Sequence, residues 1–254
     1  MRRLAPAFLL LLTAAAPQAE GERSFLLAGF ERIRVDGPYE VRVVTGGTSG
    51  ARAEGDRRAL ERLNLRVDGG TLVVTVGNTN WESWRGAAEG RTRVIVTVAR
   101  LRAALVNGGG RLTIDRMTGQ RIDLGVNGAG ALAVEAIDAD QLVASLTGTG
   151  MMTVAGKALR ATFASYGAGS IDAAGLVAND LIVRANSSGD ASFAARFTAT
   201  VNAGGVGAVT IGGSPKCIVS GPGPVFCGGV AVTGWKKFEG DTPGLPAAAR
   251  GQVW

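Results

Sequence analysis

The chain alternates apolar and polar residues in short runs, and glycine-rich turns separate these runs at regular intervals. Residues 126–134, VNGAGALAV, are one example, with apolar alternation on both sides of an N-G-x-G turn. Alignment of the last glycine of each turn gives a series of anchoring glycines: Gly110, Gly130, Gly150, Gly169, Gly189, Gly207 and Gly223. Seven copies at a period near twenty predict a solenoid, in which each copy is one coil and neighbouring coils share a core.

Residues two apart on a strand face the same way, so the columns of this alignment predict which side chains are buried. The two columns that follow the turn and face inward are Leu112, Leu132, Met152, Ile171, Ala191, Val209 and Val225, and Ile114, Val134, Val154, Ala173, Phe193, Ile211 and Cys227. The column between them faces outward and contains Thr113, Ala133, Thr153, Asp172, Ser192, Thr210 and Phe226. The two inward columns before the turn are Ala104, Leu124, Ala144, Phe163, Val183, Val201 and Cys217, and Val106, Val126, Leu146, Ser165, Ala185, Ala203 and Val219.

This pattern predicts an all-β fold, a single-stranded parallel β-helix with right-handed coils of about 20 residues. The regular coils span residues 103–227, and each has a second corner opposite the glycine turn. Residues 33–43 superimpose on the first coil with Tyr39 in the position of the anchoring glycine, so the core extends toward the N-terminus. Residues 65–76 form another turn between strands, residues 91–101 a further strand, and residues 56–63 the best candidate for a helix.

Both ends of the chain lie outside this repeat. Residues 1–19 combine two arginines, an apolar run and small residues, which is typical of a secretory signal peptide cleaved after Ala19. A membrane anchor is the alternative, although the apolar run is short for a span, and no transmembrane segment is expected after signal removal. Residues 229–254 are predicted to be a flexible tail. Within the insertion at residues 78–90, Trp81 and Trp84 either fold over the open end of the β-helix or are exposed.

Composition excludes several classes of chemistry. The chain has no histidine, which rules out imidazole-dependent triads and histidine-ligated metal sites. Loss of Arg2 and Arg3 with the signal peptide lowers the formal net charge from +6 to +4, an excess too small and scattered to imply nucleic acid as a partner. The N-G-x-G turn at Gly130 lacks the helix and the third glycine of a dinucleotide fingerprint, and six other copies of the glycine turn occur in the chain. No catalytic, cofactor or metal-binding residues are therefore assigned.

The two cysteines, Cys217 and Cys227, both fall in inward columns of the last coil and flank its G-P-G turn symmetrically. An exported protein meets an oxidising environment, so this proximity predicts a disulfide that closes the C-terminal coil. A loop of this size contributes about 2 to 3 kcal/mol to the free energy of unfolding.

Several ordered segments together resemble a known bacterial family. These are FERIRVDGPYEVRVV, LNLRVDGGTLVVTV, the repeated NGxG or TGTG turns and the closing GSPKCIVSGPG. The chain is similar over about residues 29–228 to the putative auto-transporter adhesin, head GIN domain family. That resemblance implies an exported β-helical domain, and it brings no catalytic residues and no cofactor.

Three functions are compatible with this sequence. The first is a non-enzymatic envelope or cell-surface module, located in the periplasm or outside the cell, that binds envelope polysaccharide or a surface protein through its outward Thr, Ser and Asp columns. The second is a polysaccharide-active enzyme that uses carboxylates as acid and base, with these candidates: Asp172, Asp180 and Asp190, near Lys157, Arg160 and Arg184. The third is a purely structural envelope protein. The sequence favours the first.

Overall fold

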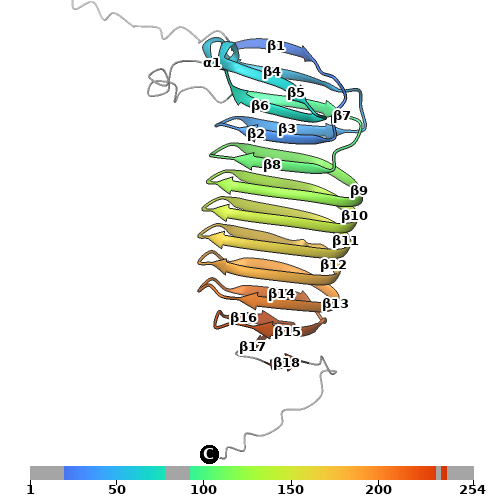
Figure 1. Ribbon diagram of the computed structural model, residues 1–254, viewed down its shortest axis with the longest axis vertical. Helices are drawn as coiled ribbons and strands as arrows, with labels where there is room; N and C mark the ends of the chain where they lie inside the picture. Colours follow the sequence, from blue (N-terminus) through green and yellow to red (C-terminus); the bar gives the residue numbers. More distant parts are fainter. Residues whose placement is uncertain (1–19, 78–91, 233–235, 239–254) are drawn as a thin grey trace, which may run out of the picture.

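The computed structural model describes residues 20–77, 92–232 and 236–238. Within this part of the chain, 18 strands form one continuous sheet that winds into a parallel β-solenoid of about six turns. The coils stack along one long axis, with the N-terminal strands at one end and β15–β18 at the other (Figure 1). The predicted fold class is therefore confirmed, whereas the signal peptide at residues 1–19 and the insertion that contains Trp81 and Trp84 lie outside the described residues.

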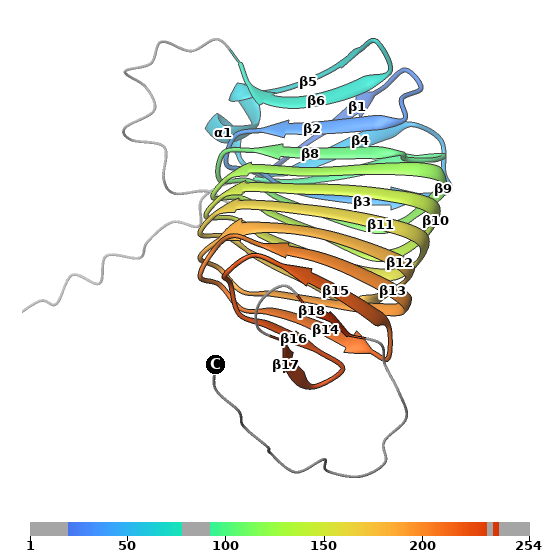
Figure 2. The same ribbon diagram turned by 60° about the horizontal axis from the view of Figure 1, so that its bottom comes forward.

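The regular coils are made of long strands in parallel register. They are β8 (Ala103–Asn107), β9 (Arg111–Gly128), β10 (Ala131–Gly148), β11 (Met151–Gly167), β12 (Ser170–Ser187) and β13 (Ala191–Ala203). Leu112, Leu132 and Met152 lie side by side on successive coils, as the alignment predicts. Each long strand runs along one side of the core, bends at the second corner and returns along the other side (Figure 2).

Every residue in the predicted inward columns is buried, and further buried residues around the second corner, such as Met117, Ile122 and Leu142, complete the core. Most core side chains are small or aliphatic, and the rings of Phe163 and Phe193 on neighbouring coils lie with their centroids 4.8 Å apart. The outward column between them is half-buried or exposed from Thr113 to Phe226. One coil alone could not bury its apolar residues, so the stack supplies the hydrophobic stabilisation.

The anchoring glycines are required by stacking. A Cβ on Gly130 would lie 2.7 Å from the carbonyl oxygen of Gly110, and the same clash with the previous coil recurs at every other anchoring glycine. A positive φ occurs in the same corner two positions before the anchoring glycine, for example at Gly128 (φ 114°). The asparagines that precede these glycines, Asn107 and Asn127, are part of the strands β8 and β9.

The N-terminal strands extend the core and close its first end. β2 (Arg32–Asp36) and β3 (Glu40–Thr45) pair with β8 and β9, and the register puts Tyr39 opposite Gly110, as predicted. Burial raises the pKa of the Tyr39 phenol, an effect that the charge of Arg62 opposes. The remaining elements here are β1 (Glu20–Leu26), β4 (Gly50–Asp56), α1 (Arg57–Arg62), β5 (Leu63–Asp68), β6 (Thr71–Val76) and β7 (Arg93–Val98).

The antiparallel pairs β1–β4, β4–β7 and β5–β6 end the parallel stack. The helix α1 coincides with the predicted helical segment. Asp56 caps its N-terminus by accepting hydrogen bonds from the backbone N–H groups of Arg58 and Ala59.

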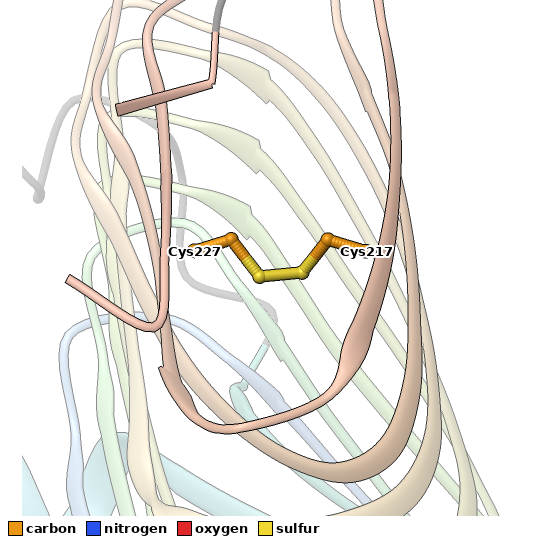
Figure 3. The surroundings of a disulfide bond; sticks show 2 residues. All are labelled: Cys217 and Cys227. Carbon is orange, nitrogen blue, oxygen red and sulfur yellow. A yellow bond between two sulfur atoms is a disulfide. The ribbon is translucent and has the colours of Figure 1, made fainter. Parts of the chain in front are cut away.

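The last coil contains β14 (Val209–Gly213), β15 (Lys216–Ser220) and β16 (Val225–Cys227). The structure confirms the disulfide, which joins Cys217 to Cys227 across the core (Figure 3). The column predicted for Cys217 was wrong by two residues, because it pairs with Ala199 and Val219 pairs with Val201. The glycine turn of this coil is two residues shorter than the others. An alignment anchored on Gly223 therefore shifted the residues before the turn by two positions.

Two short strands follow the last coil, within the range predicted to be a tail. β17 (Val230–Val232) pairs antiparallel with β16, and β18 (Lys236–Phe238) pairs antiparallel with β15.

Candidate binding face

Two long faces lie on opposite sides of the core, and the disulfide spans the distance between them (Figure 3). The strand segments after the glycine turn carry the small-residue face, which comprises Thr113, Ala133, Thr153, Asp172, Ser192 and Thr210. The segments before the turn carry what we call the polar face on β10–β13, which comprises Gln141, Ser145, Thr147, Arg160, Thr162, Tyr166, Arg184, Asn186 and Thr200. The two faces share one core but present different chemistry.

Strand alternation positions the side chains of the polar face. On β11, Phe163 and Ser165 are buried, so Thr162 and Tyr166 point away from the core. Parallel register places Tyr166 between Thr147 on β10 and Asn186 on β12. Tyr166 is 44% exposed and shares this face with polar side chains and with one exposed aliphatic residue, Ile182, which is 42% exposed. A planar ring therefore stands among hydroxyl and amide groups on adjacent strands.

The hydrogen-bonding capacity of this face differs along the stack. Near the N-terminal end, Asn107 donates to Asp36 (2.6 Å) and Asn127 donates to Asn107 (3.1 Å), so asparagines stacked on adjacent coils bond to each other. Further along the same column, Thr147, Tyr166 and Asn186 have no side-chain hydrogen bond to any described residue. The side chains of Asn107 and Asn127 already bond within the protein, whereas those of Thr147, Tyr166 and Asn186 remain available to a ligand.

The charges of the polar face are also available. Arg160 and Arg184 form no ion pair within residues 20–77, 92–232 and 236–238. Asp180 lies beside Arg160 in the parallel register and accepts a hydrogen bond from the Thr198 hydroxyl at 2.6 Å. Amides, hydroxyls and guanidinium groups next to an exposed ring are the groups that recognise a polyhydroxylated ligand.

The three carboxylates considered for catalysis are not brought together as an acid–base pair across one bond. Asp172 lies on the small-residue face, whereas Asp180 follows the second corner on the opposite side of the core. Each accepts a bond within its own surroundings: Asp172 from the Ala174 N–H (3.3 Å), and Asp190 from the Ala208 N–H (2.8 Å). The three carboxylates therefore make the local hydrogen bonds that aspartates commonly make on surface strands and turns.

Lys157, one of the cations considered with these carboxylates, forms a salt bridge with Asp138 at 3.1 Å. Within the described part of the chain, no group of three Cys, Asp or Glu side chains could hold a metal ion. In the described ranges, the helix α1 is too short to cross a membrane.

The family can be assigned from the sequence and fits the geometry. A family model described as putative auto-transporter adhesin, head GIN domain, matches residues 29–215. The chain belongs to this family. Membership confirms the resemblance drawn from the ordered turns, and the family is one of adhesin-like β-solenoids. Together with the disulfide, it indicates an exported protein.

Solved structures of several bacterial proteins share the fold with this family member. A putative adhesin from Bacteroides fragilis NCTC 9343 aligns with a TM-score of 0.74 at 19% identity, covering 83% of this chain and 96% of its own. A putative adhesin from Parabacteroides merdae ATCC 43184 gives 0.62 at 14% identity, covering 83% and 97%. A putative lipid binding protein from Parabacteroides distasonis ATCC 8503 gives 0.60 at 18%, covering 84% and 96%. No curated protein matches the chain.

The outward Thr, Ser and Asp columns remain the binding surface expected from the sequence, and the outward residues before the glycine turn were not considered there. The missing signal was available, because the outward positions before the glycine turn follow from the same alternation as those after it. Residues next to Phe163 and Ser165 had to point outward once these two were assigned to the core.

Proposed function

We propose that this protein is a non-enzymatic, adhesin-like binding module that engages carbohydrate of the cell envelope or cell surface through the polar face. Tyr166 carries the proposal, since it stands exposed between Thr147 and Asn186 without a hydrogen-bonding partner among the described residues. A sugar ring presents a C–H face that packs on an aromatic ring and hydroxyls that bond to the neighbouring groups. The rigid stack holds these groups in place, which lowers the entropy cost of binding.

The spacing of the coils supports the same proposal. Adjacent parallel strands lie about 4.8 Å apart, so the polar face presents side chains from successive coils at a short, fixed interval. An extended polymer of sugar units can contact several coils at once, which a small isolated ligand cannot do. The adhesin-like family and the export indicated by the disulfide support a location where such polymers occur.

A glycan array probed with the purified protein tests the proposal, followed by calorimetric titration with the oligosaccharide that binds best. Tyr166→Ala should weaken binding about tenfold, equivalent to about 1.4 kcal/mol, because it removes the stacking surface. Met151→Ala is the matched control, since Met151 is a large side chain, 54% exposed, on the same strand but after the glycine corner. Absence of binding to any glycan, or an equal loss in both variants, would contradict the proposal.

A further inference from the structure

A hollow with an excess of positive charge lies at the N-terminal end of the solenoid, away from the polar face. It is formed where residues 99–102, between β7 and β8, meet the β5–β6 turn and the segment that leads into β2. Its volume is about 440 Å³, and Glu31, Arg32, Arg100 and Arg102 line it together with small residues. This volume falls in the range of about 300–1,000 Å³ that small-ligand sites occupy.

A second hollow of about 270 Å³ adjoins the first, because Arg100 lines both. Arg116 and Asp115 from the second corner of β9 contribute to its wall. We call the two hollows together, with Arg32, Arg100, Arg102 and Arg116, the arginine corner. Its shape suits an elongated ligand that crosses Arg100.

The carboxylates of the arginine corner are already engaged. Glu31 pairs with Arg102 at 2.9 Å. Asp115 accepts hydrogen bonds from the Thr45 N–H (3.1 Å), the Thr45 hydroxyl (3.0 Å) and its neighbour's backbone N–H at Arg116 (2.6 Å). Neither Arg100 nor Arg116 forms a side-chain hydrogen bond or ion pair with any described residue. Hydrogen bonds from neutral donors leave Asp115 charged, so the four arginines of the corner face two carboxylates, Glu31 and Asp115, and two positive charges are left in excess.

One arginine is also fixed in place before any ligand arrives. Arg32 donates from Nε to the Thr71 hydroxyl (3.1 Å) and from Nη2 to the Gly69 carbonyl (2.5 Å), leaving further N–H groups of the guanidinium free. Such restraint reduces the conformational entropy that binding would cost. A held guanidinium that shares a hollow with the unpaired Arg100 is suited to a carboxylate, which arginine binds through two parallel N–H···O bonds.

We propose that the arginine corner binds the carboxylate groups of an acidic polysaccharide. The lining favours a saccharide over a lipid, because it is rich in arginine and small residues, and its large apolar members, Phe30 and Leu101, are only 5% and 0% exposed. A bilayer-binding site would instead present large exposed apolar side chains. The site is independent of the proposed carbohydrate binding at Tyr166, since it is built from different elements at the end of the stack.

The test is calorimetric titration of the purified protein with a tetramer of galacturonic acid. The tetramer should bind, more weakly as salt rises, and a neutral cello-oligosaccharide of the same length should not occupy this site. Arg100→Gln should weaken binding five- to tenfold, and Arg100→Gln with Arg116→Gln should abolish it. Arg58→Gln is the matched control, because Arg58 is an exposed arginine on α1 outside both hollows. Circular dichroism and thermal melting check that all variants are folded.

Retained affinity in the double variant, or an equal loss in Arg58→Gln, would overturn the proposal. Binding of phosphatidylglycerol vesicles in place of the tetramer would also overturn it and would assign the corner to a lipid headgroup. Tyr166→Ala should leave tetramer binding unchanged, so the outcome here is separable from that for the polar face.

Discussion

The two corners of each coil behave differently, although both reverse the chain around the same core. At the glycine corner, the number of residues from the first inward column before the turn to the anchoring glycine is constant over five regular coils. The intervals are Leu124–Gly130, Ala144–Gly150, Phe163–Gly169, Val183–Gly189 and Val201–Gly207. At the second corner the interval varies: Gly130–Ala144, Gly150–Phe163, Gly169–Val183 and Gly189–Val201. The register shifts between neighbouring long strands fall in this second region, for example between Val134 and Ile137.

Close stacking explains the difference. The backbone of the glycine corner is hydrogen-bonded from coil to coil, as in the bonds from the N–H groups of Gly150 and Gly169 to the carbonyls of Gly128 and Gly148, both 2.9 Å. An anchoring glycine also leaves no room for a side chain. The second corner has no glycine at one repeated position in every coil, although Gly156 on β11 packs against the Ile137 backbone in the same way. It accepts bulges, exposed arginines and exposed apolar residues such as Phe197. The glycine corner is therefore the more strictly constrained of the two.

Insertion of one residue should show the largest contrast between the corners. A serine inserted between Asn127 and Gly128 breaks the coil-to-coil bonding on both sides, and we expect a loss of more than about 3 kcal/mol in the free energy of unfolding. An alanine inserted after Ala155 restores the longer interval found in the coil before it, and it should cost less than about 1 kcal/mol. Urea unfolding followed by circular dichroism measures both. Equal losses would contradict the comparison.

A methyl group on an anchoring glycine should have the next largest effect. Gly110→Ala places a Cβ against the carbonyl oxygen of Gly37, and we expect a loss of about 2 to 3 kcal/mol, seen as a lower midpoint of thermal unfolding. Gly109→Ala is the control, because a Cβ on this adjacent residue meets no atom within 4 Å. The steric explanation fails if the two variants unfold alike.

The disulfide replaces part of this constraint in the last coil, whose glycine corner is the shortened one. Replacement of both Cys217 and Cys227 by alanine should lower the free energy of unfolding by about 2 to 3 kcal/mol. Reductant should destabilise the wild type by a similar amount and leave the double variant unchanged. A wild type that is insensitive to reductant under unfolding conditions would contradict a stabilising disulfide.

The asparagine ladder beside the glycine corner should contribute least. Asn127→Ala removes the bond to Asn107 and should cost about 0.5 to 1 kcal/mol, whereas Asn186→Ala, in the same column without such a bond, should change stability by less than about 0.5 kcal/mol. Chemical denaturation of the two variants in parallel measures the difference. A larger loss in Asn186→Ala would argue against the ladder.

Much of this architecture could be predicted, because the same pattern of buried and exposed residues recurs in every coil. The columns from Leu112 to Val225 and the slot of Tyr39 followed from alternation and period alone. The antiparallel pairing of β1 with β4 could not be predicted, since it occurs once and joins residues far apart in the sequence. The requirement for glycine at position 130 comes from its contact with the previous coil, and the local sequence pattern does not reveal this contact. Only the exposed fraction and the hydrogen-bond partners of each side chain in the structure distinguish Tyr166 from the other outward residues of the polar face.

The most direct test of the binding face is NMR chemical-shift mapping of the isotope-labelled protein with the oligosaccharide selected on the array. We predict that the backbone and side-chain signals of Thr147, Tyr166 and Asn186 shift on titration, whereas those of Thr153 and Ser192 on the opposite face stay in place. Shifts confined to the small-residue face, or none on β10–β12, would contradict the assignment of carbohydrate binding to the polar face.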